Sequence, residues 1–472
     1  MNTGERDTDD STTAEPAAEN STTNRKQPFP RGFLDTISTG WAERPESLPV
    51  ARTQAPYAAA RRAAVSAAFP GRRLVIEAGS LKQRSNDTDY VFRAHSAFAH
   101  LTGWAADSEP DSVLVFDPTD AGHDVTLYFR ERADRTTPEF YADATVGEFW
   151  IGPRPAIAGV AADLALATDH LAAFEAGDDD LTLDDAELAR FVSELRLIKD
   201  EFEIAEMRRA VEVTASGFED IIRSLPDAVS HSRGERVVEG VFHRRAREDG
   251  NGEGYDTIAA SGPHACYLHW TRNDGAVVPG DLILVDAGVE ADSLYTADIT
   301  RTLPVSGAFT EVQRRVYETV REAADAAFAA ARVGVPFREV HGAAMKVIAE
   351  RTAEWGLLPV TAEEALDADA GGQHRRYMVH GTSHHLGIDV HDCAQARREM
   401  YYDGLLEPGM VFTIEPGLYF QIDDLTVPAE YRGIGVRIED DILMTADGPV
   451  NLSAGIPRTA DDVEAWIRRV QD

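Results

Sequence analysis

The first half of the chain alternates short apolar runs with a helix-compatible stretch. The apolar runs have the length of buried strands and read "RRLVIEA" (72–78), "SVLVFDP" (112–118) and "VTLYFRE" (125–131). "AAARRAAVSAAF" (58–69), just before the first of them, suits a helix. This alternation predicts an α/β domain over residues 46–185.

A long helical pattern follows this domain. From residue 183 to residue 222, apolar residues recur at spacings of three and four, which indicates amphipathic helix with a break near Lys199. We expect residues 186–200 to form a helical connector between two domains.

The second half of the chain places helices between two groups of strand-like runs. The runs are "DLILVDAGVE" (281–290), "YTADITRTLPV" (295–305), "GMVFTIEPGLYF" (409–420) and "GVRIEDDILM" (435–444), and the helical segments cover 310–334 and 336–356. This order predicts an α+β domain over residues 201–472, with helices packed on one face of a mostly antiparallel sheet.

The N-terminal segment is polar. Residues 1–45 are rich in Thr, Glu, Asp, Asn and Pro and hold few large apolar side chains, which predicts a disordered tail. The sequence also lacks a signal-peptide pattern and any run of about eighteen apolar residues, so we expect a cytoplasmic protein.

The charge is strongly negative. The 81 acidic and 46 basic residues give a formal net charge of −35, which would repel nucleic acid and anionic membranes. We therefore expect neither as a partner.

Four carboxylates interrupt the strand-like runs: Asp286, Asp298, Glu415 and Glu439. Burying an isolated carboxylate costs several kcal/mol, so such groups usually become neutral, pair with a base or bind a metal. The stretch "HGTSHHLGIDVHD" adds four histidines, His380, His384, His385 and His391. Four negative charges with His384 predict a site for two divalent cations, and a ligand set dominated by carboxylates favours Mn²⁺ over a structural zinc ion.

Five motifs carry a family resemblance. "LVDAG", "ADITRT", "HGTSHHLGIDVHD", "TIEPGLY" and "RGIGVRIEDD", in this order, resemble the motifs of metallopeptidase family M24, and within it those of the aminopeptidases P. The resemblance implies a pita-bread catalytic domain preceded by a smaller, creatinase-like α/β domain. It also implies an Xaa-Pro aminopeptidase, which releases the N-terminal residue from peptides with proline in the second position by attack of a hydroxide bridging two divalent metals.

The resemblance also assigns roles to individual residues. The implied metal ligands are Asp286, Asp298, His384, Glu415 and Glu439, with Asp298 and Glu439 bridging both metals. The implied catalytic residues are Glu415, His391, His269 and His380, and the implied substrate-binding residues are Tyr255, His269, His380, His391 and Arg437. His385 is expected to pack rather than to bind metal. The segment between Asp286 and Asp298 is one residue longer than the usual family spacing, and we place the extra residue in a turn around residues 291–293.

Several alternatives remain open at this point. An Xaa-Pro dipeptidase (prolidase) has the same metal ligands and differs in whether longer peptides are cleaved, whereas methionine aminopeptidases normally lack the large N-terminal domain. A non-catalytic binding module of the M24 fold would be expected to lose metal ligands, and this chain retains all five. We expect peptide substrates and a homo-oligomer, either a dimer or a tetramer.

Overall fold

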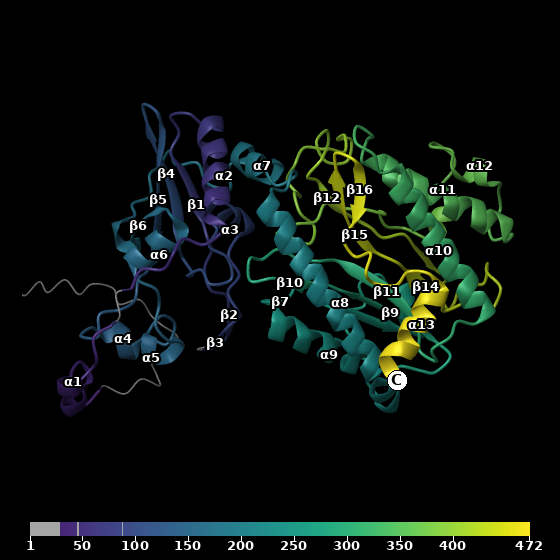
Figure 1. The fold of residues 1–472 in the computed structure, drawn as a ribbon, viewed down its shortest axis with the longest axis horizontal. Helices are drawn as coiled ribbons and strands as arrows, with labels where there is room; N and C mark the ends of the chain where they lie inside the picture. Colours follow the sequence, from purple (N-terminus) through teal and green to yellow (C-terminus); the bar gives the residue numbers. More distant parts are fainter. Residues whose placement is uncertain (1–28, 45–46, 87) are drawn as a thin grey trace, which may run out of the picture. The chain divides into compact units, whose positions relative to one another are not determined.

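The computed structural model describes residues 29–44, 47–86 and 88–472 (Figure 1). These residues form two compact units. The first contains the described residues of Met1–Ser47 with Ser80–Phe92 and Glu131–Ala156, and the second contains Leu48–Gly79, Arg93–Arg130 and Ile157–Asp472. The boundaries of these units differ from the domain boundaries expected at residues 45, 185 and 200. The expected domain boundaries stay predictions.

The first unit is built on aromatic contacts. Its elements are α1 (Arg31–Ile37), α4 (Pro138–Ala142), α5 (Glu148–Ile151) and the hairpin of β2 (Gln83–Ser85) and β3 (Thr88–Asp89). The ring of Trp41 lies edge-on to Phe140 and Phe149 at centroid distances of 5.5 and 6.0 Å, and Phe33 stacks on Phe29 at 4.7 Å. The expected tail therefore needs a correction for residues 29–44, because these rings supply the apolar contacts that we expected the segment to lack. Residues 1–28 of that tail lie outside the described residues.

A four-stranded sheet opens the second unit, in the order β1-β4-β5-β6. Its strands are β1 (Leu74–Glu77), β4 (Val113–Thr119), β5 (Gly122–Phe129) and β6 (Ala167–His170), and only the β5–β6 pair is parallel. The accompanying helices are α2 (Ala55–Ala68), α3 (Ser96–Thr102), α6 (Ile157–Leu164) and the 3-10 turn η2 (Leu171–Ala173). The three apolar runs read from the sequence are β1, β4 and β5, which confirms the α/β prediction.

Three helices follow this sheet: α7 (Ala186–Glu194), α8 (Glu201–Ser230) and α9 (Gly234–Asp249). The predicted break near Lys199 is confirmed. A new helix begins there because the Asp200 side chain accepts from the Glu203 backbone N–H while the Glu203 side chain accepts from the Asp200 backbone N–H.

The rest of the second unit combines antiparallel strands with long helices. The strands are β7 (Gly252–Glu253), β8 (Ile258–Ser261), β9 (Leu282–Ala287), β10 (Val289–Glu290), β11 (Ile299–Pro304), β12 (Val411–Ile414), β13 (Gly417–Tyr419), β14 (Gly435–Arg437), β15 (Asp440–Thr445) and β16 (Gly448–Asn451). The helices are α10 (Glu311–Ala330), α11 (Arg338–Glu354), α12 (Ala362–Ala365) and α13 (Ala460–Gln471), with 3-10 turns η3 (Gly262–Cys266) and η4 (Gln373–Arg376). Residues of α8, α9, α10, α11 and α13 share one apolar core with β9, β11, β12 and β15. The predicted order of strands, helices and strands is confirmed, and the strands pair antiparallel as expected.

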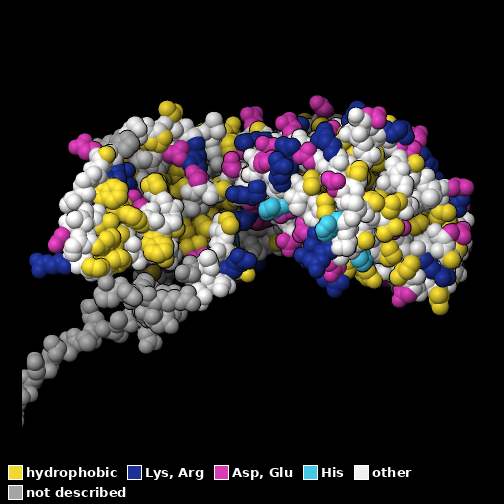
Figure 2. Space-filling view, turned by 90° about the horizontal axis from the view of Figure 1, so that it is seen from below, with side chains coloured by type: hydrophobic (Ala, Val, Ile, Leu, Met, Phe, Trp, Pro, Cys, Tyr) yellow, Lys and Arg dark blue, Asp and Glu magenta, His cyan; other side chains and the backbone are white. Residues whose placement is uncertain are grey.

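The surface carries both signs of charge. On the face drawn in Figure 2, Lys and Arg side chains are interspersed with Asp and Glu. In the part of the chain that the structure describes, no helix combines the length and the apolar character needed to span a bilayer.

Candidate active site

The ten predicted site residues come together in one pocket. A cavity of about 650 Å³ is lined by Tyr255, His269, Asp286, Asp298, His380, His384, His391, Glu415, Arg437 and Glu439. Segments far apart in the sequence therefore line one cavity.

Strand register explains how the carboxylates meet. In the antiparallel β9–β11 pair, Asp286 lies opposite Thr300, so both side chains point to one face of the sheet. Asp298 lies two residues before Thr300 and continues that face. Glu415 and Glu439 flank the β12–β15 pair, whose last register pair is Ile414 with Asp440. Both strand pairs thus direct their acidic residues into the same cavity.

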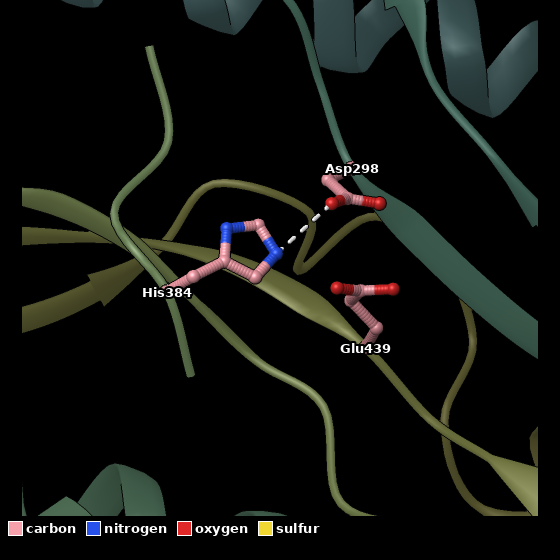
Figure 3. A group of neighbouring side chains, drawn as sticks. All are labelled: Asp298, His384 and Glu439. Carbon is pink, nitrogen blue, oxygen red and sulfur yellow. Dashed lines mark ion pairs between the residues drawn. The ribbon is translucent and has the colours of Figure 1, made fainter. Parts of the chain in front are cut away.

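Three donor groups form the tightest cluster of potential metal ligands. One donor atom each of Asp298, His384 and Glu439 lies within 4.8 Å of the others, and the imidazole points at the two carboxylates (Figure 3). His384 Nε2 is 3.3 Å from Asp298 Oδ2 and 3.5 Å from Glu415 Oε1. The other ring nitrogen of His384, Nδ1, donates to the His385 carbonyl at 3.1 Å. That bond orients the ring so that Nε2 is the atom turned toward the carboxylates and toward a metal held by them.

The Tyr255 hydroxyl links the carboxylates of Asp286 and Asp298. Its hydroxyl lies 2.7 Å from Asp286 Oδ1 and 2.5 Å from Asp298 Oδ1. Burial, together with the charges of Asp286 and Asp298, raises the pKa of Tyr255 well above its usual value. The phenol is therefore neutral and can donate its hydrogen bond to either carboxylate.

The site favours added positive charge. Burial raises the pKa of Asp298, and burial with the nearby carboxylates raises the pKa of Glu439 well above the ordinary range. Burial also raises the pKa of Glu415 to about 7. Against the effect of burial, the hydrogen bond to Asp298 and the charge of Glu415 raise the pKa of His384 to about 9. Carboxylates and an imidazole in this arrangement fit divalent cations, which would offset the crowded negative charges.

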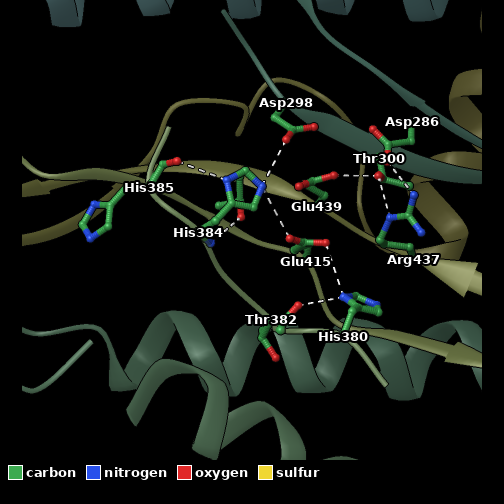
Figure 4. A network of polar contacts seen from close by, with 12 residues as sticks. Asp286, Asp298, Thr300, His380, Thr382, His384, His385, Glu415, Arg437 and Glu439 are labelled. Atoms are coloured by element: carbon green, nitrogen blue, oxygen red, sulfur yellow. Dashed lines mark hydrogen bonds and ion pairs between the residues drawn. The ribbon is translucent and has the colours of Figure 1, made fainter. Parts of the chain in front are cut away.

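A chain of hydrogen bonds borders the metal-ligand candidates (Figure 4). Arg437 donates to Asp286 through Nη2 and to the Tyr419 hydroxyl at 3.1 Å through Nη1. The Tyr419 hydroxyl is 2.8 Å from His380 Nε2, and His380 Nδ1 donates to the Gly381 carbonyl at 2.7 Å. Since Nδ1 holds the proton, Nε2 accepts from Tyr419, and burial lowers the pKa of His380 to about 3. His380 is thereby held as a neutral, oriented ring.

His385 lies outside the pocket. Its ring is fully buried, with centroids 4.6 Å from both Phe337 and Tyr401, and neither ring nitrogen has a hydrogen-bond partner among the described residues. His385 therefore packs, as expected, and the assignment of His384 as a metal ligand stays a prediction.

Comparison with known proteins agrees with this geometry. The profile of metallopeptidase family M24 matches residues 205–446, and that of the aminopeptidase P N-terminal domain matches residues 58–176. The chain belongs to metallopeptidase family M24. The predicted family and fold class are confirmed.

Among M24 relatives, Xaa-Pro aminopeptidase 1 of Streptomyces coelicolor is 51% identical over 460 residues, covering 92% of this chain and 91% of the relative. The Xaa-Pro aminopeptidase of Escherichia coli is 33% identical and covers 86% of this chain and 96% of the relative. Among solved structures, proline aminopeptidase P II from Yersinia pestis has a TM-score of 0.75 at 30% identity, covering 89% of this chain and all of that one. Pseudomonas aeruginosa aminopeptidase PepP has a TM-score of 0.76 at 28% identity, covering 90% and 100%.

Three residues of this M24 site were not singled out from the sequence. Tyr419 connects His380 to Arg437, Thr300 donates to Glu439 at 2.6 Å, and the buried Asp441 accepts from the backbone N–H of Asp298. Tyr419 and Thr300 stand inside the quoted motifs "TIEPGLY" and "ADITRT", which was the available signal. Asp441 ends the quoted motif "RGIGVRIEDD", but an acidic residue next to Asp440 in a strand reads from sequence as solvent-facing.

Proposed function

We propose that this chain is a metal-dependent Xaa-Pro aminopeptidase. It releases the N-terminal residue from peptides that carry proline in the second position. The observation that carries the proposal is the convergence of all ten expected residues on one pocket, in a chain 51% identical to a named Xaa-Pro aminopeptidase over nearly its whole length.

Five residues would hold two divalent cations: Asp286, Asp298, His384, Glu415 and Glu439. Asp298 and Glu439 would be shared between the cations, Asp286 would complete one ligand set, and His384 with Glu415 would complete the other. The ligand set is mostly carboxylate, which favours Mn²⁺. The short distances among Asp298, His384 and Glu439 support this assignment.

When bound, the two cations would activate a water molecule as the nucleophile and polarise the scissile carbonyl. Glu415 would accept the proton of that water and deliver it to the proline nitrogen as the peptide bond breaks. Its place on the cavity wall, 3.5 Å from His384 Nε2, supports its contact with that water. His391 and His269 would donate hydrogen bonds to the oxygen that gains negative charge.

The remaining residues would recognise the substrate. Tyr255, His269, His380, His391 and Arg437 would surround the proline ring, and the apolar side chains of Ile258, Leu268 and Val390 line the same cavity. A pocket with apolar walls suits a ring that has no N–H to donate once proline is in a peptide bond. His380 would present the face of a neutral, fixed ring to the substrate, because Tyr419 and Gly381 engage both of its nitrogens.

The test is a metal-reconstitution assay. The purified protein is stripped with a chelator and reloaded with Mn²⁺, Zn²⁺, Co²⁺ or Mg²⁺ separately. Each form is assayed on Xaa-Pro-Yaa tripeptides, on Xaa-Pro dipeptides and on Xaa-Ala-Yaa controls. We expect Mn²⁺-dependent cleavage of the tripeptides with little cleavage of the controls. Cleavage of dipeptides alone would point to a prolidase, and no cleavage with any metal would refute the proposal.

Two features of the cellular state belong to the proposal. A cytoplasmic location is part of the proposal, and cell fractionation tests it. A dimer or tetramer is expected from the family resemblance, and light scattering coupled to size-exclusion chromatography tests it.

A further inference from the structure

The loop of residues 262–275 carries His269 to the pocket. It leaves strand β8 through η3 and returns toward β9, and both Leu268 and His269 line the cavity. His269 has its proposed role only if this loop is held in place.

One buried carboxylate ties the loop together. Glu235, in the first turn of α9, is fully buried and accepts four hydrogen bonds, two at each oxygen. Oε1 accepts from the backbone N–H of Ser261 and from His264 Nδ1, both at 2.8 Å. Oε2 accepts from Trp270 Nε1 at 2.9 Å and from the backbone N–H of Gly275 at 2.6 Å. Glu235 thus binds both ends of the loop and two of its side chains.

Helix α9 and the loop of residues 262–275 also contact each other closely at Gly275. The backbone N–H of Glu235 donates back to the Gly275 carbonyl at 3.2 Å. A Cβ atom at Gly275 would lie 2.8 Å from Glu235 Oε2 and 2.7 Å from His264 Cε1, closer than real Cβ contacts. The position of Glu235 near the positive end of the helix dipole suits a negatively charged side chain.

Trp270 connects Glu235 to the pocket residue His269. It directly follows His269 in the chain, its indole N–H is bound to Glu235, and its ring stacks on His264 at a centroid distance of 3.9 Å. A displacement of Trp270 would therefore displace His269. A shift of about 1 Å in a reacting group can cost up to about a hundredfold in rate.

We infer that Glu235 is a positioning residue for the reaction: its carboxylate holds the 262–275 loop so that His269 faces the pocket. The inference rests on the role proposed above for His269. It assigns Glu235 no contact with substrate or metal.

The decisive variant is Glu235→Gln, with Glu248→Gln in the same helix as the matched control. Gln keeps the shape of Glu but turns one oxygen into an NH₂ group, which would face two donors instead of accepting from them. The Glu248 carboxylate is exposed and pairs with Arg244. We expect Glu235→Gln to lower kcat by about tenfold to a hundredfold at unchanged metal content. Glu248→Gln should match wild type.

A double-mutant cycle separates positioning from general loss of structure. If Glu235 acts through His269, Glu235→Gln should change kcat less than about twofold when it is made in a His269→Ala protein. A wild-type kcat for Glu235→Gln, or an equal loss of kcat in both backgrounds, would overturn the inference. If Glu235→Gln does not fold, Gly275→Ala takes its place, because the added methyl pushes on the same carboxylate from the loop side. A wild-type kcat for Gly275→Ala would then overturn it.

Hydrogen exchange tests the anchoring without relying on activity. Amides of residues 262–275 should exchange faster in Glu235→Gln than in wild type, and at the wild-type rate in Glu248→Gln. Unchanged exchange in Glu235→Gln would overturn the inference. If wild type cleaves no Xaa-Pro peptide, the proposed function fails, and this measurement still decides whether Glu235 holds the loop.

Discussion

Replacing His385 by Phe should leave catalysis intact and stabilise the protein, most strongly in acid. The His385 ring is fully buried beside Phe337, Tyr401 and Phe412, and its two nitrogens have no hydrogen-bond partner. A phenyl ring can fill much of the same space, and it removes two buried polar atoms whose desolvation is not compensated.

The expected size follows from the pKa of His385. Burial lowers this pKa from 6.5 to about 3. Below pH 6.5 the unfolded chain therefore binds a proton at His385 that the folded chain does not bind, so the free energy of unfolding falls as the pH falls from 6.5 toward 3. At pH 5 this loss amounts to about 2 kcal/mol relative to pH 8. The phenyl side chain of the variant cannot titrate, so His385→Phe should gain about 2 kcal/mol on wild type between pH 8 and pH 5.

The assay compares urea-unfolding midpoints of the two proteins at pH 8 and pH 5, in chelator so that metal binding does not contribute. Titration of the other histidines is common to both proteins and cancels in the difference. Metal content and kcat are measured in parallel, with His384→Phe as the neighbouring control that should lose both. If the difference in unfolding free energy between His385→Phe and wild type is the same at pH 8 and pH 5, the His385 imidazole is not buried in its neutral form. A metal-free His385→Phe beside a fully loaded His384→Phe would show that the ligand had been assigned one residue too early.

Three further predictions address the metal site and the N-terminal segment. Asp298→Asn or Glu439→Gln should abolish activity, because each removes a negative charge proposed to be shared by both cations; near wild-type turnover with unchanged metal content would contradict the two-cation site. His391→Ala should keep its metal by elemental analysis and lower kcat by about a hundredfold to a thousandfold, roughly 2.7–4 kcal/mol, as expected for the loss of one donor to the developing negative charge; loss of metal would contradict that role. Deleting residues 1–28 should leave kcat and Tm unchanged because their composition is polar. A large effect of this deletion would show that the segment packs against the rest of the protein. Trp41→Ala, in contrast, should lower Tm because the Trp41 ring contacts Phe140 and Phe149.

Much of the site was predictable because its residues break a regular pattern. Asp286 and Asp298 interrupt apolar strand runs, and charges in such positions need a compensating partner, which made them visible without coordinates. The choice between His384 and His385 required the family motif, and the structure explains it through the packing partners of His385. One of these, Phe337, stands 48 residues before it in the sequence, and no local pattern reveals that contact.

Other features could not be read from the sequence because they depend on long-range packing. Glu235 stands in a polar helical segment and reads as one exposed acid among many. It is nevertheless fully buried, and its carboxylate binds a loop that follows its helix and two short strands. Helix α1 was missed because its one aromatic residue, Phe33, packs against Tyr141, about a hundred positions later in the chain. In both cases the decisive contact lies outside any window over which periodicity is judged.

The β9–β11 hairpin has an evolutionary consequence. Neighbouring side chains of a strand point to opposite faces, so one residue inserted within either strand would turn Asp286 or Asp298 away from the pocket. The connection between the strands differs: the backbone N–H of Ala291 donates to the Tyr295 carbonyl at 2.9 Å, and Leu294 adopts a left-handed φ of 68°. A length change confined to this turn leaves both strands in register. We therefore expect insertions and deletions among related enzymes to collect between residues 291 and 295, while the strands on either side keep a constant length.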